Sequence, residues 1–498
     1  MRAKNKRNLI IMAAMVVLLI GVFVAVQIIN SKNNKGSDNG LVKSSVSLIS
    51  FKKNEISKVS YQYRGEEWVN YKMAQDTWYN ADDEDFPLAS SAFANNFVEK
   101  IVKLSTSRQL AKQEEAQNYG LDDPYLTVRI ENASGKTETL YLGEYNSMIK
   151  EYYLKIEGSD EIYTTGTDLI YMCRADIYDY ATIESFPTYS QADLNGIVLK
   201  NDDIEIEFTY FTDGYETDLI GECRWFFKTP FSHYRSAETN KINDLKSDVI
   251  DNLQFAKLAN YNPSQEDLEQ YGLLDVKRQY IINYNSKDEE TGVTMDCSKI
   301  VDFGNYDDES KCYYARMIET KGNVREVSDN IYLISREAVD ALLGIDPLDY
   351  IYKYVIYVKI TDVANENGNI TFDTPDGQFV LENKSVVKQD GTTEEDIYYL
   401  NGELMDEDDV EDFYLGILSK AWIERIIYDK STVITDKEPT YTITYNRNKD
   451  DYYGNAVVEY TEYDMNYYQA TVNGVTDVLV NKRILDETMA QLKKMTEK

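Results

Sequence analysis

Histidine is almost absent from this sequence of 498 residues, which contains only His233. Histidine is the usual general base near neutral pH and the commonest metal ligand. A single copy excludes HExxH zinc sites and multi-histidine metal sites, and it allows a Ser-His-Asp triad only if His233 supplies the base. Because no G-x-S-x-G motif accompanies it, we expect His233 to be a solvent-exposed loop residue ahead of a helix.

Cysteine is also scarce. The chain has four, and none of them shows CxxC spacing: Cys173, Cys223, Cys297 and Cys312. Four are too few for a disulfide framework in so long a chain, and their spacing does not suit a zinc site. A bond between Cys297 and Cys312 across adjacent strands stays open at this point.

The motifs of phosphate loops and penicillin-binding enzymes are incomplete. Residues 134–137 read Ser-Gly-Lys-Thr, but a phosphate loop needs a glycine where Ile130 stands. Residues 132–135 join two alternating runs, which predicts a hairpin turn. Ser50 and Lys53 give an S-x-x-K spacing without the S-D-N and K-T-G partners. We therefore assign no catalytic, cofactor-binding or metal-binding residues.

Two acidic runs, residues 82–85 and 406–409, lack the glycine at the sixth place of a calcium loop. Both stand ahead of a predicted helix, where carboxylates stabilise the positive N-terminus. We expect both runs to have that structural role. Paired carboxylates that hydrolyse glycosides stay possible, because so acidic a chain offers many pairs.

Positive charge is scarce outside the N-terminus. The formal net charge is −34, and residues 1–30 contain four basic and no acidic residues. An acidic field repels nucleic-acid phosphates and anionic lipid headgroups, so we expect no nucleic-acid partner and a highly soluble folded part. Aromatic residues are nevertheless frequent, with 42 tyrosines. Tyrosine suits half-buried sheets and interaction surfaces, since its ring buries apolar area while its hydroxyl stays hydrated.

Only one long apolar run exists, from Leu9 to Ile29, directly behind the basic N-terminus. Its 21 residues match the thickness of a bilayer core, and positive flanks stay cytoplasmic. The run does not end in an A-x-A site that signal peptidase would cleave, and it lacks the cysteine that follows the apolar region of a lipoprotein. We predict a cytoplasmic tail (1–8), an uncleaved transmembrane helix (9–29), a flexible tether (30–42) and an extracytoplasmic remainder.

Several landmarks recur in the same order along the remainder, which predicts internal repeats. The first two copies share a Tyr-Gly-Leu segment, a glycine–aromatic turn, a tyrosine pair and an Ile-Tyr strand. In the first copy these are residues 119–121, 142–145, 152–153 and 162–163, and in the second 271–273, 303–306, 313–314 and 331–332. The glycine of Tyr-Gly-Leu suits the position after a helix, where a left-handed backbone is needed.

A third, diverged copy lacks Tyr-Gly-Leu but keeps an alternating strand at 441–445, a tyrosine pair at 467–468 and a strand at 478–480. Each copy also has an aromatic pair followed by an amphipathic helix. The pairs are 78–79, 225–226 and 398–399, and the apolar helix faces are Phe93, Phe97, Ile101 and Leu104; Ile242, Leu245, Val249 and Leu253; and Val410, Phe413 and Ile417.

The alternation between periods of 2 and 3.6 predicts an α+β fold rather than parallel α/β. We expect one N-terminal transmembrane helix followed by three tandem, mostly antiparallel sheet-plus-helix repeats. Their limits are 43–190, 191–347 and 348–498.

This combination resembles the bacterial domain of unknown function family 4340. The resemblance rests on the basic tail and apolar helix, Trp78-Tyr79 before a helix, the Tyr-Gly-Leu-x-x-Pro segment at 119–124 and the Leu-Gly turn at 142–143. It is best over residues 60–175 and returns over 220–345. Val276 replaces the proline in the second copy. The resemblance implies membrane-attached extracytoplasmic proteins that accompany ABC transporters of the gliding-motility type, and it carries over no catalytic residues.

We therefore expect a non-enzymatic, membrane-anchored accessory or binding subunit of an ABC-type transport system, with the permease and ATPase subunits as partners. Two alternatives stay open. One is a cell-envelope hydrolase that uses paired carboxylates, and the other is a free-standing surface binding protein.

Overall fold

A computed structural model describes residues 41–111, 113–213, 215, 223–288, 291–365, 367–385, 396–419, 421–448 and 454–497. The predicted tail, membrane helix and most of the tether lie outside these ranges. No helix within them has both the length and the apolar character needed to cross a membrane. The chain divides into two compact units, Met1–Thr182 and Ile183–Lys498.

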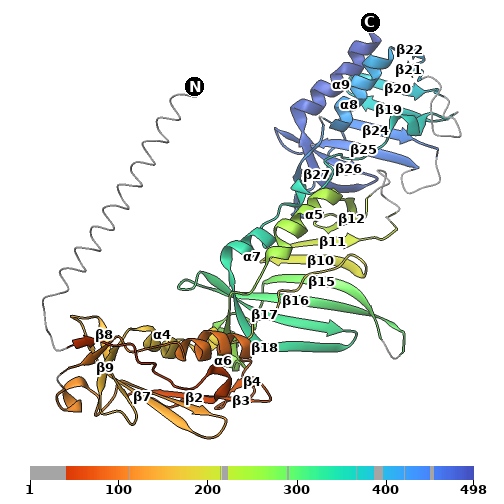
Figure 1. The fold of residues 1–498 in the computed structure, drawn as a ribbon. Coiled ribbons are helices and arrows are strands. Elements are labelled where there is room, and N and C mark those ends of the chain that lie inside the picture. Colours follow the sequence, from red (N-terminus) through yellow and green to blue (C-terminus); the bar gives the residue numbers. More distant parts are fainter. Residues whose placement is uncertain are drawn as a thin grey trace, which may run out of the picture. The chain divides into compact units, whose positions relative to one another are not determined.

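The first unit contains one nine-stranded antiparallel sheet, in the order β1-β5-β9-β8-β7-β6-β2-β3-β4 (Figure 1). Its strands are β1 (Leu41–Lys43), β2 (Ile56–Tyr63), β3 (Val69–Ala74), β4 (Thr77–Asn80), β5 (Arg108–Leu110), β6 (Leu126–Asn132), β7 (Thr137–Asn146), β8 (Glu151–Ile156) and β9 (Ile162–Thr165). Leu41 and Val42, the last residues of the predicted tether, pair with Leu110 and Gln109 as the first strand.

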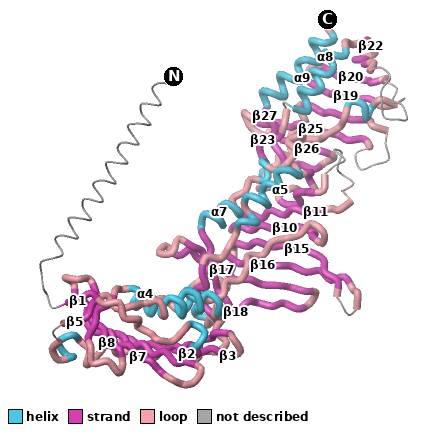
Figure 2. The backbone as a smooth tube through the Cα atoms, in the orientation of Figure 1, coloured by secondary structure: helices cyan, strands magenta, loops and turns pink. Residues whose placement is uncertain are grey.

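The second unit contains two more nine-stranded antiparallel sheets, which Figure 2 shows in magenta. Strands of the second sheet are β10 (Leu194–Asn201), β11 (Ile204–Tyr210), β12 (Trp225–Thr229), β13 (Arg235–Ser236), β14 (Lys257–Tyr261), β15 (Arg278–Lys287), β16 (Thr294–Asp307), β17 (Cys312–Lys321) and β18 (Val324–Ser335). Those of the third are β19 (Asn369–Thr374), β20 (Gly377–Asn383), β21 (Tyr398–Leu400), β22 (Glu403–Leu404), β23 (Ile423–Ile426), β24 (Tyr441–Asn446), β25 (Asn455–Glu462), β26 (Tyr467–Val472) and β27 (Val475–Asn481).

The three sheets share one strand order. The orders are β5-β9-β8-β7-β6-β2-β3-β4 in the first, β14-β18-β17-β16-β15-β10-β11-β12 in the second and β23-β27-β26-β25-β24-β19-β20-β21 in the third. The first sheet adds β1 beside β5, whereas the others add β13 and β22 at the opposite edge. This topology confirms repeated antiparallel sheets, including the diverged third copy.

Each predicted amphipathic helix forms, but two of them end before the last residues of the predicted faces, since Leu104 lies outside the first helix and Val249 and Leu253 lie outside the second. In the first repeat the helix runs through α2 (Ser90–Phe93), a π-helical segment η2 (Ala94–Val98) and α3 (Glu99–Ile101), with Phe93 and Phe97 fully buried. The counterparts are α5 (Thr239–Asp248) and α8 (Glu407–Ser419). A further helix follows the last strand of each sheet in chain order: α4 (Asp168–Arg174), α7 (Arg336–Leu343) and α9 (Lys482–Thr496). The apolar faces of the helices thus complete the hydrophobic cores of the three repeats.

Short helices complete the described chain. They are η1 (Lys53–Glu55), η3 (Ala116–Tyr119), η4 (Ile177–Tyr180), η5 (Ile250–Asn252), α6 (Gln265–Gln270), η6 (Pro347–Asp349), η7 (Ile360–Val363) and η8 (Lys430–Thr432).

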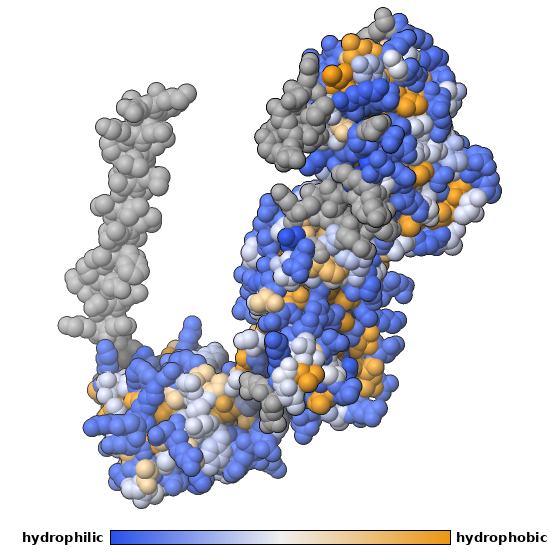
Figure 3. Space-filling model, turned by 90° about the vertical axis from the view of Figure 1, so that its right-hand side faces the viewer, coloured by the Kyte–Doolittle hydropathy of each residue, from blue (hydrophilic) through white to orange (hydrophobic). Residues whose placement is uncertain are grey.

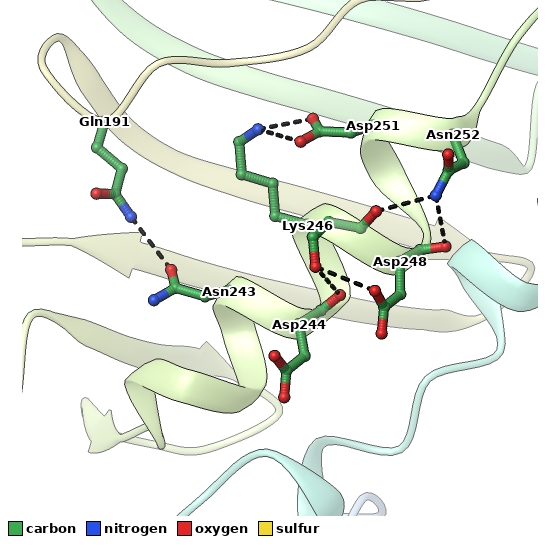
Figure 4. A network of polar contacts seen from close by, with 8 residues as sticks. Gln191, Asn243, Asp244, Lys246, Asp248, Asp251 and Asn252 are labelled. Atoms are coloured by element: carbon green, nitrogen blue, oxygen red, sulfur yellow. Dashed lines mark hydrogen bonds and ion pairs between the residues drawn. The ribbon is translucent and has the colours of Figure 1, made fainter.

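Polar side chains close the C-terminal end of α5 (Figure 4). The Nδ2 atom of Asn252 donates to the backbone oxygens of Ser247 and Asp248 at 2.9 and 3.1 Å. These carbonyls belong to the last turn, where a helix has no internal partners for them. Lys246 pairs with Asp251 at 2.6 Å and so ties α5 to the turn that follows. These contacts fix the helix end with ordinary capping chemistry.

In the first and second repeats, the two glycine landmarks lie against each other. Gly120 and Gly272 have φ of +67° and +69° just after η3 and α6, as expected of a left-handed position after a helix. A Cβ atom added at Gly143 or Gly304 would lie 2.0 or 2.1 Å from the backbone oxygen of the tyrosine in Tyr-Gly-Leu. Only glycine permits this approach, so the most conspicuous repeated residues have a packing role.

All four cysteines lie within the described residues, are buried and form no disulfide bond. Cys297 lies opposite Lys321, whereas Cys312 lies opposite Asp307, at the other end of the β16–β17 ladder. The ladder therefore separates the two thiols, which excludes the disulfide left open above.

Candidate functional site

A cavity of about 590 Å³ opens in the first unit. Its walls come from the end of β2, the β2–β3 turn, the end of β4, the residue before β6 and the C-terminal end of α4. The lining is Tyr61, Tyr63, Glu66, Glu67, Val69, Asn80, Asp82, Tyr125, Cys173, Arg174, Ala175 and Ile177. The size lies within the range of small-molecule sites.

Tyrosine rings form one wall of this cavity. Tyr61 is buried in the core, and Tyr63 and Tyr125 meet edge-on with centroids 5.5 Å apart. The hydroxyl of Tyr63 donates to the backbone oxygen of Ile170 at 3.1 Å, which ties β2 to α4. The guanidinium of Arg174 lies 5.8 and 5.5 Å from the centroids of these two rings. The wall therefore already holds a cation against aromatic faces.

Carboxylates line the mouth of the cavity. Within the described ranges, the exposed side chains of Glu66 and Glu67 take part in no ion pair. Asp82 accepts from the backbone N and the Nδ2 of Asn70, both at 2.9 Å. With Arg174 as the one basic residue of the lining, the lining has a net negative charge.

The contacts of Asp82 correct the expected role of the first acidic run. Helix α2 begins only at Ser90, and its N-cap residue Ala89 has no side-chain capping bond. Residues 82–85 are thus too far from the helix along the chain to cap it. Asp82 instead links the segment after β4 to Asn70 in β3. The second run behaves as predicted, because Glu407, Asp408 and Asp409 occupy the first turn of α8 and Asp406 accepts from the backbone N of Asp408.

Cys173 lines the cavity but is a poor nucleophile. Burial raises the pKa of its thiol well above the usual value. A thiol in apolar surroundings stays protonated near neutral pH and reacts slowly. The cavity therefore offers surfaces for binding rather than an activated cysteine.

The single histidine lies in a polar cluster of the second unit, where the loop after β12 meets the third sheet. The side chain of His233 is 19 % exposed, and its Nδ1 lies 3.5 Å from Oδ2 of Asp477. The hydroxyl of Ser232 donates to Oδ1 of the same carboxylate at 2.6 Å. The prediction of a solvent-exposed histidine is wrong, because Asp477 covers it from a strand that lies far away in sequence.

This trio has the composition of a hydrolytic triad but a different order. A triad places the imidazole between hydroxyl and carboxylate, so that it can take the hydroxyl proton. Here the carboxylate of Asp477 stands in the middle and also accepts from the backbone N of Ser232 at 3.0 Å and from Lys430 at 2.6 Å. These contacts link β27 and η8 of the third repeat to a loop of the second repeat. The Ser-His-Asp group therefore has a structural role.

Electrostatics support the same interpretation. Burial alone would raise the pKa of Asp477, but hydrogen bonds from Lys430 and Ser232 hold that pKa below its usual value. Burial and the positive charge of Arg235 lower the pKa of His233. His233 is thus neutral and Asp477 ionised at neutral pH.

We expect the pKa of His233 to be measurably below 6.5. A lowered pKa means that the unfolded chain binds this proton more tightly, so its contribution to stability is complete above pH 6.5 and declines as the pH falls below it. Because the chain has one histidine, its single imidazole NMR signal reports this titration directly. A midpoint at or above 6.5 would contradict the half-buried position of the imidazole. The unfolded protein in urea gives the reference value.

The other motif-like segments have ordinary partners. Residues 132–135 form the turn between β6 and β7, with Gly135 at φ +82°, as predicted. Ser50 bonds Glu138, whereas Lys53 pairs with Glu99 at 2.9 Å. Ser50 and Lys53 therefore bind different carboxylates and make no common site.

Sequence reasoning named Asp82 only as part of an acidic run and Cys173 only as one of four scattered cysteines, and it named none of the other residues of the cavity. Glu66 and Glu67 stand in a turn, and Arg174 ends a helix more than one hundred residues later. Only the abundance of tyrosine hinted at an interaction surface, and it did not single out Tyr63 or Tyr125.

Fold and cavity together define a repeat protein of tandem antiparallel sheets with a polar, aromatic-walled pocket in its first unit. The sequence profile of DUF4340, a domain of unknown function, matches residues 78–245. The match confirms the resemblance, and it spans most of the first repeat and the first part of the second. Comparison with curated proteins gives no match. Comparison with solved structures gives none either.

Proposed function

We propose that this chain is a non-enzymatic, membrane-anchored accessory or binding subunit of an ABC-type transport system, with its repeats outside the cytoplasm. The cavity of the first unit carries the proposal, because it combines a ligand-sized volume with aromatic walls and unpaired charges. These are the features of a recognition site.

The use of the repeated residues supports a binding role. The recurring glycines serve close backbone packing, and the Ser-His-Asp group links two sheets. On the face drawn in Figure 3, hydrophilic residues predominate and apolar residues are scattered among them. Such a surface suits a large domain exposed to water.

The anchor and the transporter partner come from the sequence. The basic residues before Leu9 and the apolar run to Ile29 support an anchor with the repeats on the outer side. The resemblance to the domain of unknown function implies a transporter nearby. We propose that the N-terminal helix contacts the permease, while the repeats bind a substrate or an envelope component.

Affinity purification from native membranes tests this proposal. The full chain, tagged at its C-terminus and solubilised in mild detergent, should recover permease and ATPase subunits of one transporter. A variant that lacks residues 1–29 but carries a cleavable export signal should lose them, because the helix makes the contact. Recovery of no transporter subunit with the full chain would overturn the proposal.

A further inference from the structure

We propose that the cavity of the first unit binds an organic cation, a ligand with an ammonium or guanidinium group on an apolar stem. The inference rests on the proposed binding function and specifies the chemistry of its ligand.

The aromatic wall of the cavity already makes a cation–π contact. The guanidinium of Arg174 lies against both Tyr63 and Tyr125 within 6 Å of their centroids, a distance at which the ring quadrupole attracts a cation. The buried ring of Tyr61 continues this surface into the cavity. The apolar stem of the ligand would contact these rings, while its cationic group would lie at Glu66 and Glu67, away from the guanidinium of Arg174, which would repel it.

The charges of the mouth favour the same ligand. Glu66, Glu67 and Asp82 give three carboxylates against the single guanidinium of Arg174. Within the described ranges, no three acidic, histidine or cysteine side chains come close enough to share one metal ion. The carboxylates are therefore spread around a volume of about 590 Å³, which matches an extended organic cation.

A second cavity, of about 620 Å³, lies in the second unit against β16, β17 and β18, and its lining contains four acidic residues, two of which bind neighbouring side chains. Glu184 accepts from Tyr332 at 2.7 Å, and Glu319 pairs with Lys321 at 3.1 Å. The lining of this second cavity contains no tyrosine and a single aromatic residue, Phe186, so it lacks the aromatic wall of the first cavity.

Isothermal titration calorimetry of the full chain in detergent with agmatine tests the inference, because agmatine joins a guanidinium to an ammonium by a short alkyl stem. We expect saturable binding of one agmatine per chain. The double variant Glu66→Gln/Glu67→Gln should weaken binding about tenfold, since it removes both unpaired charges. Tyr125→Leu should weaken it about fivefold and Tyr125→Phe less than about twofold, because the flat ring rather than the hydroxyl would contact the alkyl stem.

A matched control separates the cavity from the acidic surface as a whole. Glu157→Gln/Asp160→Asn removes two charges from exposed positions of the same unit, in the turn between β8 and β9. This variant should bind agmatine within about twofold of the unaltered chain. Equal weakening by both double variants, or no saturable binding to the unaltered chain, would overturn the inference.

A second titrant distinguishes a free amine from a basic protein segment. N-acetyl-arginine amide carries the guanidinium of a protein side chain without a free ammonium. Tighter binding of this compound than of agmatine supports a partner's arginine, and the reverse supports a small amine. Recovery of a transporter without agmatine binding would retain the proposed function and remove this inference alone.

Discussion

Replacing Gly143 with alanine should destabilise the first unit by about 3 kcal/mol, because the new Cβ atom would stand 2.0 Å from the backbone oxygen of Tyr119. A backbone oxygen cannot rotate away as the end of a side chain can. Either the β7–β8 bulge or the turn after η3 must therefore move. Gly304 stands 2.1 Å from the oxygen of Tyr271 and should show an effect of the same size in the second repeat.

Hydrogen exchange of the full chain is the sharpest measurement, since it reports on each repeat separately. Gly143→Ala should speed exchange in residues 116–146 and leave the second unit unchanged. Gly166→Ala is the matched control, because an added Cβ there meets nothing within 4 Å and the φ is ordinary. Indistinguishable exchange for the two variants would show that the packing of the glycines is unimportant.

These glycines also show what sequence can reveal of this fold. The recurrence of Tyr-Gly-Leu and of a glycine–aromatic turn predicted two equivalent units, and the shared strand order confirms them. Sequence showed that both landmarks recur, but not that they touch, because residues 120 and 143 come together only when β7 folds back. The third copy lost Tyr-Gly-Leu and kept its sheet, since alternating apolar residues are enough to specify the strands.

The candidate site was much less accessible to prediction. The cavity takes Glu66 from a turn, Tyr125 from before a strand and Arg174 from a helix end. Nothing local marks such residues, because an exposed glutamate in a turn looks the same with or without a cavity behind it. The partial burial of His233 was missed for the same reason, as its partner Asp477 lies on the last strand of the third sheet in chain order.

The predicted role of the acidic run at 82–85 was wrong for a more local reason. The run precedes a helix in the sequence, but residues 86–89 separate it from the N-terminus of α2. Asp82 found nearer donors in the backbone and side chain of Asn70 across the β3–β4 hairpin. The run at 406–409 continues directly into α8, so there the same inference holds.

Replacing Asp477 with asparagine should lower the stability of the second unit by about 2–4 kcal/mol, comparable to the effect at Gly143. The side chain of Asp477 is 2 % exposed and accepts hydrogen bonds from Ser232 and Lys430. An amide offers one acceptor oxygen, and its NH₂ group would face a donor. The ammonium of Lys430 would also lose its counter-charge.

The expected result is earlier unfolding in urea and faster hydrogen exchange in the loop after β12 and in η8, the segments that Asp477 joins. Asp436→Asn is a suitable control, because Asp436 is exposed and close in sequence, and it should change stability by less than about 0.5 kcal/mol. Since the pKa of Asp477 is lowered in the folded chain, its contribution is complete above about pH 4 and declines as acid protonates it. The difference between the unaltered chain and Asp477→Asn should therefore shrink below about pH 4. A difference that stays constant as the pH falls below 4 would assign the loss to packing, and the link between the two sheets would then not depend on this charge.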